Sequence, residues 1–172
     1  MLTLGAQNND FPILGGIMAT RYLQLFDLQA LVGQPLGSSE WLTVDQARID
    51  AFAAATGDHQ WIHTASAQAA NGPFGGPIAH GFLTLSLLPV LMQAAYRIEN
   101  ARMSINYGLN RVRFPAVLPA GSRVRGHATL TAYESLEGGA QITVTISVER
   151  EGQGKPVCIA ESLSRHFVEQ SA

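Results

Sequence analysis

Within residues 141–150, polar and apolar side chains alternate from Gln141 to Glu149, and this pattern is typical of a β-strand with one buried face. The apolar members are Ile142, Val144, Ile146 and Val148, and the polar members between them are Thr143, Thr145 and Ser147. Turn signals containing Gly and Pro separate this segment from three further β-rich segments: residues 105–114, 122–133 and 157–167. We therefore predict an antiparallel sheet of hairpin-linked strands in the C-terminal half.

A long apolar segment, residues 79–97, precedes the strands and predicts a buried helix. Pro89 lies inside it and predicts a kink or an unpaired carbonyl group, because proline has no N–H. The uncharged stretch from Gly81 to Met92 is shorter than the roughly 20 residues that a membrane-spanning helix needs, so we expect no membrane role. A long helix followed by antiparallel strands predicts an α+β fold, with the sheet curled around the helix.

The chain divides into a short extension and one domain. Residues 1–17 are rich in Gly and Asn and weakly patterned, and we predict a flexible N-terminal extension there. Residues 18–172 contain no internal repeat and no Pro- or Ser-rich linker, so we predict a single domain. The chain has 172 residues, of which 47% are hydrophobic, and this composition excludes a disordered or collagen-like protein.

Shorter helices are predicted over residues 19–30, 43–56 and 65–71, and residues 40–42 are expected to end a first strand. The second helix has the clearest signals. Thr43 and Gln46 form a capping-box pattern at its start, and Gly57 predicts its end. Its predicted apolar stripe is Val44, Ala47, Ala51, Phe52 and Ala55.

Charge and cysteine content exclude several functions. The chain carries 11 basic and 13 acidic residues, so it has no positive field to hold nucleic acid. Nearly all the basic residues are arginines, whose planar fork suits phosphate oxygens. The single cysteine, Cys158, excludes an intramolecular disulfide and fits a reducing compartment. No Lys or Arg precedes Arg21, so the charged front of a signal peptide is missing, and we predict a cytoplasmic protein.

The densest cluster of titratable side chains follows the predicted end of the second helix. Asp58 and His63 lie there and can converge on one small substrate, where one group holds water and the other transfers a proton. The spacing alone favours a simpler interpretation, in which Asp58 caps the next turn and His63 is an ordinary surface or core histidine. His59 and His63 are also four residues apart, but Gln60 replaces the glutamate of the zinc-protease motif, so no metal site is predicted.

A second feature lies where the chain enters the long apolar segment, at His80 and Gly81. The first N–H groups of a helix have no partner inside the helix and carry the positive end of its dipole, so they can bind an oxyanion. Glycine at position 81 would let a substrate carbonyl group approach the backbone closely. Taken by itself, the His-Gly pair is explained as well by close helix packing.

Three motifs together resemble the MaoC-like family of (R)-specific enoyl-thioester hydratases and dehydratases, in a branch similar to the nodulation protein N group. The motifs are residues 56–63 (TGDHQWIH), residues 77–83 (PIAHGFL) and residues 106–115 (NYGLNRVRFP) followed by 119–121 (PAG). The resemblance covers residues 43–167 and implies the hot-dog fold. It also implies that Asp58 and His63 form the catalytic pair, and that the N–H of Gly81 stabilises the thioester oxygen.

The sequence departs from the commoner family pattern, which has Asn-Pro between the acid and the histidine. Gln60 and Trp61 stand there, and Trp61 is bulkier than proline, so we expect both to contact the substrate, together with His80. A serine near the middle of the long helix often supports the acid in this family. Ser86, in the turn before Pro89, is our candidate for that position.

Four arginines on the predicted strands could hold the phosphates of coenzyme A: Arg111, Arg113, Arg123 and Arg125. At least two of them are expected to be ordinary solvent-facing charges, and we assign Arg111 and Arg113 to the substrate. The resemblance implies no metal, nicotinamide or flavin, so coenzyme A enters only as part of the substrate.

The implied activity is the reversible hydration of trans-2-enoyl thioesters, carried by coenzyme A or acyl-carrier protein, to (R)-3-hydroxyacyl thioesters. His63 is the expected main general base, with Asp58 as its partner. Two alternatives stay open: an acyl-CoA thioesterase on the same fold, and a non-catalytic acyl-thioester-binding protein. A single hot-dog sheet exposes an edge and an apolar surface, so we expect a homodimer.

Overall fold

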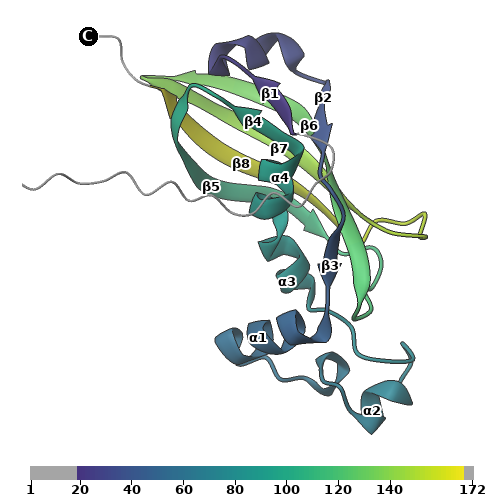
Figure 1. The fold of residues 1–172 in the computed structure, drawn as a ribbon. Coiled ribbons are helices and arrows are strands. Elements are labelled where there is room, and N and C mark those ends of the chain that lie inside the picture. The colour runs from purple at the N-terminus through teal and green to yellow at the C-terminus, as the bar shows by residue number, and fades with distance from the viewer. Residues whose placement is uncertain (1–18, 169–172) are drawn as a thin grey trace, which may run out of the picture.

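The computed structural model describes residues 19–168 (Figure 1), so the extension predicted for residues 1–17 lies outside the described residues. In chain order the elements are β1 (Thr20–Tyr22), the 3-10 helix η1 (Leu25–Leu31), β2 (Pro35–Ser38), β3 (Leu42–Val44), α1 (Gln46–Thr56), the 3-10 helix η2 (Trp61–His63), α2 (Ala67–Ala70), α3 (Gly81–Ser86), α4 (Leu88–Ala95), β4 (Tyr96–Ile98), β5 (Ala101–Arg113), β6 (Ser122–Leu136), β7 (Gly139–Arg150) and β8 (Cys158–Val168).

A six-stranded antiparallel sheet forms the main layer, in the order β2-β6-β7-β8-β5, with β3 paired to the start of β6. The strands β5 to β8 confirm the four predicted β-rich segments. The largest difference is that β5 begins at Ala101 instead of residue 105. The four apolar side chains of β7 are at most 1% exposed, which confirms the predicted alternation.

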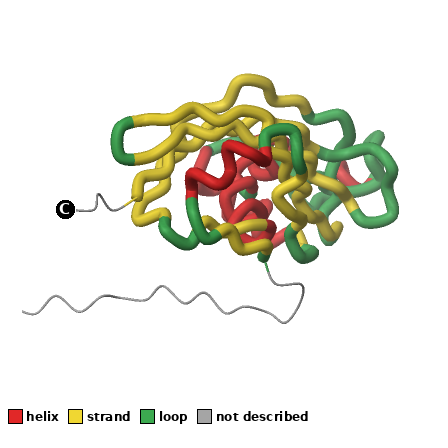
Figure 2. Tube along the Cα trace, turned by 90° about the horizontal axis from the view of Figure 1, so that it is seen from above, coloured by secondary structure: helices red, strands yellow, loops and turns green. Residues whose placement is uncertain are grey.

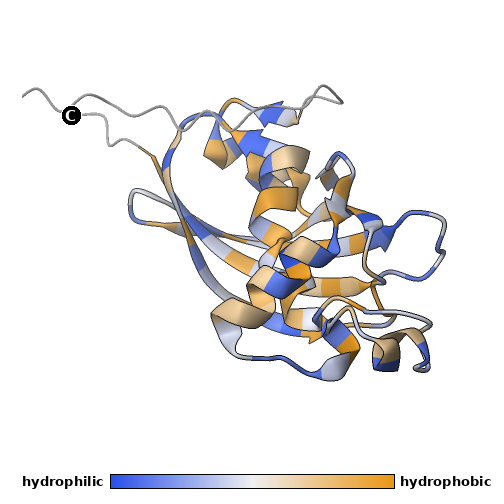
Figure 3. Cartoon of the chain, turned by 60° about the horizontal axis from the view of Figure 1, so that its bottom comes forward, coloured by the Kyte–Doolittle hydropathy of each residue, from blue (hydrophilic) through white to orange (hydrophobic). Residues whose placement is uncertain are grey.

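The sheet curls around α3 and α4, and Figure 2 shows the helices enclosed by strands. Gly126 of β6 allows close contact with α4, because an added Cβ there would lie 3.0 Å from the Cβ of Leu91. Hydrophobic residues are frequent on α4 and on the strands that face it (Figure 3), and the buried side chains of these elements form one core cluster. The predicted α+β hot-dog architecture is therefore confirmed.

The helix predicted over residues 79–97 is found as two helices, so the kink predicted from Pro89 is confirmed as a break, while the predicted bounds are too wide. The break comes at Leu87, and Pro89 lies in the first turn of α4, where a missing N–H costs no helical hydrogen bond. Helix α4 ends at Ala95, because residues 96–98 form β4, which pairs in parallel with β1. No helix within residues 19–168 has the length and apolar character needed to cross a membrane.

The N-terminal predictions are only partly correct. Residues 19–30, predicted as one helix, contain β1 and most of the 3-10 helix η1, because β1 pairs with the distant strand β4. Residues 40–42 do not end the first strand: β2 ends at Ser38, and Leu42 begins β3. The short helix expected over residues 65–71 is found as α2, with Ser66 as its N-cap.

Helix α1 begins three residues later than predicted, because Thr43 lies in β3 and pairs with β6. Asp45 is the actual N-cap, and its carboxylate accepts a hydrogen bond from the N–H of Arg48 at 2.9 Å. The predicted apolar stripe is correct only in part, because Val44 is buried in β3 and Phe52 packs against the core from α1. Its three alanines are exposed, and the residues that α1 buries are Ile49 and Ala53.

Candidate active site

The position of Asp58 is set by the end of helix α1, which lies two residues before it. The helix ends at Gly57 as predicted, with a φ of +78°, and the Gly57 N–H donates to the carbonyl of Ala53 at 2.8 Å. The side chain of Asp58 is 55% exposed. Its Oδ1 accepts a long hydrogen bond of 3.4 Å from the N–H of Gln60. Asp58 thus supports the next turn weakly, and its carboxylate remains open to solvent.

His63 is buried at the end of η2, and its ring forms a hydrogen bond with the segment that contains Ile78. Its Nδ1 lies 2.7 Å from the carbonyl oxygen of Ile78. Because a carbonyl group only accepts, Nδ1 carries the proton and Nε2 keeps its lone pair. The Ile78 N–H donates to the carbonyl of Ile62 at 2.9 Å, so the two chain segments are tied together. The lone pair on Nε2 is what a general base needs.

His80 lies against both predicted catalytic groups. Its ring stacks on that of His63, with the centroids 3.6 Å apart, and its Nε2 donates to the main-chain carbonyl of Asp58 at 3.0 Å. One carboxylate oxygen of Asp58 and one ring nitrogen from each histidine lie within 4.8 Å of one another. The structure therefore brings together three residues from two parts of the chain, residues 58–63 and residue 80.

These three residues also form a possible donor set for a metal ion. The two rings are 25° from parallel, and a ring nitrogen donates electrons only in the plane of its ring. A cation in the plane of one ring would therefore lie out of the plane of the other. The arrangement does not suit a metal ion.

Gly81 is the first residue of α3 and follows His80 directly. The N–H groups in the first turn of a helix have no acceptor inside it, so the Gly81 N–H is available to a substrate oxygen. A Cβ added at Gly81 would lie 2.9 Å from the ring of Phe114. The glycine therefore also allows the close approach of an aromatic ring.

Three further residues predicted to serve the substrate or the acid, Gln60, Trp61 and Ser86, differ in exposure and in their contacts. Gln60 is exposed beside Asp58, and Trp61 is half-buried. The Trp61 ring lies against the backbone of Gly72, where an added Cβ would come within 2.9 Å of it. Ser86 is exposed, and its hydroxyl donates at 2.7 Å to the carbonyl of Phe82 in its own helix. The hydroxyl group of Ser86 thus donates its hydrogen bond within α3.

Two polar side chains at the site were not predicted. Gln46 of α1 donates from Nε2 to the main-chain carbonyl of His63 at 2.8 Å. Thr84 of α3 is buried, and its hydroxyl donates to the carbonyl of His80 over a long 3.4 Å. The four-residue spacing of Thr84 from His80 is the signal that could have identified it, since such residues share a helix face.

Acidic residues on or beside β7 engage two of the four arginines. Arg123 donates to Glu151 at 2.9 Å and Arg125 donates to Glu149 at 2.8 Å. Hydrogen bonds from His127 and Arg125 lower the pKa of the Glu149 carboxyl group. These two arginines therefore form ion pairs within the sheet and match the expectation that some would be ordinary strand charges.

The other two arginines, Arg111 and Arg113, lie at the end of β5 and are exposed. The side chain of Arg111 is 82% exposed, and its guanidinium group is 4.0 Å from the carboxylate of Glu161. Arg113 donates to the carbonyl of Val112. Phe114 is the next residue, and its ring occupies the space that a Cβ at Gly81 would need, so this end of β5 reaches the site.

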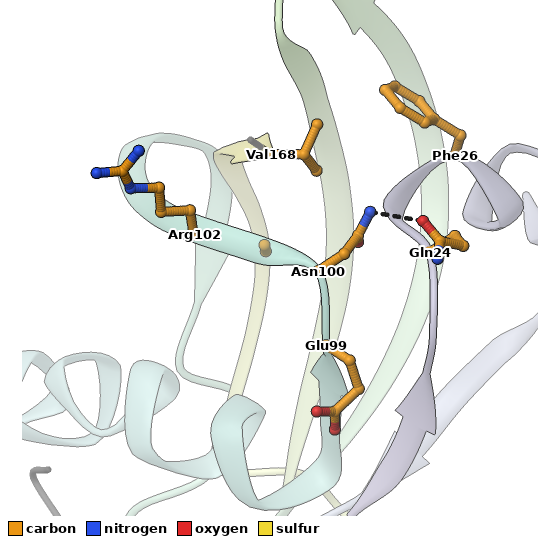
Figure 4. A pocket seen from close by; sticks show the side chains of 7 residues that line it. Gln24, Phe26, Glu99, Asn100, Arg102 and Val168 are labelled. Carbon is orange, nitrogen blue, oxygen red and sulfur yellow. Dashed lines mark hydrogen bonds between the residues drawn. The ribbon is translucent and has the colours of Figure 1, made fainter. Parts of the chain in front are cut away.

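An open pocket of about 510 Å³ lies at the start of β5, the end remote from Phe114 (Figure 4). It is lined by Gln24, Phe26, Glu99, Asn100, Ala101, Arg102 and Val168. In Figure 4 the side chains of Asn100 and Gln24 meet, and the Asn100 amide donates to Gln24 Oε1 at 2.8 Å. None of these residues belongs to the group around Asp58.

Comparisons with known proteins identify the family to which the chain belongs. Residues 27–152 match the family model of the MaoC like domain. The chain is 52% identical over 141 residues to 3-hydroxyacyl-thioester dehydratase Z of Mycobacterium tuberculosis (strain ATCC 25618 / H37Rv), covering 81% of this chain and 93% of that protein. It is 48% identical over 143 residues to nodulation protein N of Rhizobium leguminosarum bv. viciae, covering 80% and 88%.

A solved structure extends the comparison. The (R)-hydratase from A. caviae, described as involved in PHA biosynthesis, has a TM-score of 0.63 to this chain and 27% sequence identity, covering 77% of this chain and 94% of that one. The family resemblance predicted from the three motifs is thereby confirmed. The chain belongs to the family of proteins with a MaoC-like domain.

Proposed function

We propose that the protein catalyses the reversible addition of water to trans-2-enoyl thioesters, giving (R)-3-hydroxyacyl thioesters. The observation that carries this proposal is the convergence of Asp58 and His63 within 4.8 Å, beside the start of α3 at Gly81. The names of a dehydratase relative and of a hydratase neighbour support it. The reaction needs no redox group and no metal, because the thioester itself activates the double bond.

In the hydration direction, Asp58 and the Nε2 of His63 hold one water molecule. Asp58 offers a carboxylate oxygen and His63 a ring nitrogen no more than 4.8 Å apart, and two hydrogen bonds of about 2.8 Å each can span such a separation. His63 removes a proton from the water as its oxygen attacks C3, and the protonated His63 returns this proton to C2, so the proton count balances and His63 ends neutral. Dehydration follows the same path in reverse.

Negative charge develops on the thioester oxygen as C3 is attacked. The N–H of Gly81 is a preformed donor for this oxygen, and it needs no reorganisation during the reaction. Such a donor strengthens its interaction only as the charge forms, so it lowers the barrier more than it tightens substrate binding.

A coenzyme A carrier would place its phosphates near Arg111 and Arg113. These exposed side chains lie at the end of β5 that reaches Gly81. The other two arginines of the set donate to glutamates at 2.8–2.9 Å, whereas Arg111 is 4.0 Å from Glu161. We also place the reaction in the cytoplasm. The only cysteine, Cys158, is buried and unpaired, so the fold requires no oxidising compartment.

Mixing the protein with crotonyl-CoA tests the proposed reaction. We expect the enoyl absorbance to fall and chiral analysis of the product to give (R)-3-hydroxybutyryl-CoA. Free thiol released at the same rate as the absorbance change would instead identify a thioesterase. Saturable binding without either product would identify a non-catalytic acyl-thioester binder.

We further propose that the protein is a homodimer joined through β5. Among the described strands, β5 pairs only with β8, so its other edge is unpaired. Four large apolar side chains at alternate positions along β5 are 45–54% exposed: Met103, Ile105, Tyr107 and Leu109. A long apolar edge strand favours pairing with a second chain, and two copies of β5 can satisfy each other.

The substitution Ile105→Glu is expected to convert the dimer to a monomer, because it places a charge at an apolar contact between two chains. Sedimentation equilibrium measures the mass. The matched control is Thr131→Glu, which adds the same charge at an exposed position of β6. A wild-type protein with the mass of one chain, or an unchanged dimer in Ile105→Glu, would contradict the interface.

A further inference from the structure

His80 contacts both members of the proposed catalytic pair. One nitrogen bonds the main chain of Asp58, and the ring face stacks on His63. We infer that His80 is a positioning residue that fixes Asp58 relative to His63. This inference rests on the proposed function, and it replaces the earlier expectation that His80 contacts the substrate.

The hydrogen bonds of His80 define its tautomer. Nε2 lies 3.0 Å from the Asp58 carbonyl oxygen, which can only accept, so Nε2 carries the proton. Nδ1 is buried and has no hydrogen-bond partner within residues 19–168. A proton on Nδ1 would leave that buried N–H unsatisfied and would leave the Asp58 carbonyl without its donor. The site therefore holds His80 as the Nε2–H tautomer.

Asp58 depends on this bond because its other contacts are long. The Asp58 N–H is 3.4 Å from the hydroxyl oxygen of Thr56, and Oδ1 is 3.4 Å from the N–H of Gln60. The bond from His80, at 3.0 Å, is shorter than both of these, and it comes from a side chain only 3% exposed. Without it, the carboxylate would move with an irregular segment of backbone.

The opposite side of His80 is anchored in the core. The ring of Phe52 lies 5.0 Å from the His80 ring, and the His80 carbonyl accepts the N–H of Thr84 at 3.1 Å. The next residue, Gly81, supplies the proposed donor to the thioester oxygen. The main chain and ring of His80 therefore connect all three proposed catalytic groups to helix α3.

The variants His80→Ala and His80→Gln test this role in the full chain, with His59→Gln as the control in an exposed neighbouring position. We expect His80→Ala to lower kcat for crotonyl-CoA by about 100-fold, with a much smaller change in KM, because the acid is misplaced while the binding surface remains. The Gln side chain can place an N–H near the position of Nε2, so His80→Gln should recover part of kcat. Full activity in His80→Ala, or no recovery in His80→Gln, would overturn the inference.

A second measurement does not depend on turnover. Long-range ¹⁵N NMR spectra of the wild-type protein at neutral pH should show His80 protonated at Nε2 only, and His80→Gln should leave the ring signals of His63 closer to wild type than His80→Ala does. A His80 proton on Nδ1 would contradict the positioning role. If the wild-type protein fails to hydrate crotonyl-CoA, the proposed function fails, and the NMR result still decides how His80 is held.

Discussion

The variants Asp58→Asn and His63→Ala are each expected to lower kcat/KM for crotonyl-CoA hydration by about 10²- to 10⁴-fold. Asp58→Asn keeps the size of the side chain but removes the negative charge that helps to hold and polarise the water. His63→Ala removes the lone pair of Nε2, which the bond from Nδ1 to Ile78 leaves free. Continuous measurement of the enoyl absorbance gives the rates.

The buried position of His63 requires a structural control, because His63→Ala also removes a hydrogen bond to Ile78. In His63→Asn, the side-chain amide can still donate near the position of Nδ1, while nothing replaces Nε2. We therefore expect His63→Asn to be nearly as inactive as His63→Ala but to melt closer to wild type. Asp27→Asn, at an exposed position in η1, controls for the loss of a surface charge. Wild-type rates in both Asp58→Asn and His63→Asn would remove the catalytic assignment.

The variant Gly81→Ala is expected to lower kcat by about 10²- to 10³-fold, the loss typical of removing one oxyanion donor. The added Cβ would lie 2.9 Å from the ring of Phe114, which is closer than side-chain carbons pack. Either the ring or the start of α3 must move, and a shift of α3 would displace the N–H from the thioester oxygen. The effect should appear in kcat more than in KM, because the donor acts on charge that develops during the reaction.

A double substitution separates the two causes of this loss. If contact with Phe114 displaces the N–H, then Gly81→Ala combined with Phe114→Ala should be more active than Gly81→Ala alone. Phe114→Ala alone gives the reference rate, since Phe114 is 40% exposed and its removal leaves the core intact. An undiminished rate in Gly81→Ala would show that this backbone position does not serve the reaction.

The sheet could be predicted because its strands carry local signals. The alternation in β7 and the glycines between strands report burial and turns directly, and they need no knowledge of partners. The errors arose where distant pairing overrides local preference. Thr43 matches a helix cap but pairs with Arg123 of β6, and residues 96–98 extend an apolar helical pattern but pair with β1.

The site was partly predictable for a similar reason. The spacing of Asp58 and His63 and the His80-Gly81 pair are short motifs, so their presence is visible along the chain. Their mutual arrangement is not, because it depends on the bond from His63 to Ile78 and on the stacking of two histidines. The placement of Gln46 against His63 likewise depends on how α1 packs beside η2.

The central claim is that Asp58, His63 and the N–H of Gly81 act on one enoyl thioester, and a crystal structure of the Asp58→Asn variant with bound crotonyl-CoA tests it most directly. We predict that the thioester oxygen accepts a hydrogen bond from Gly81 and that C3 faces residue 58 and the Nε2 of His63. A thioester whose carbonyl carbon, instead of C3, faces residue 58, or one bound away from these three groups, would contradict the account.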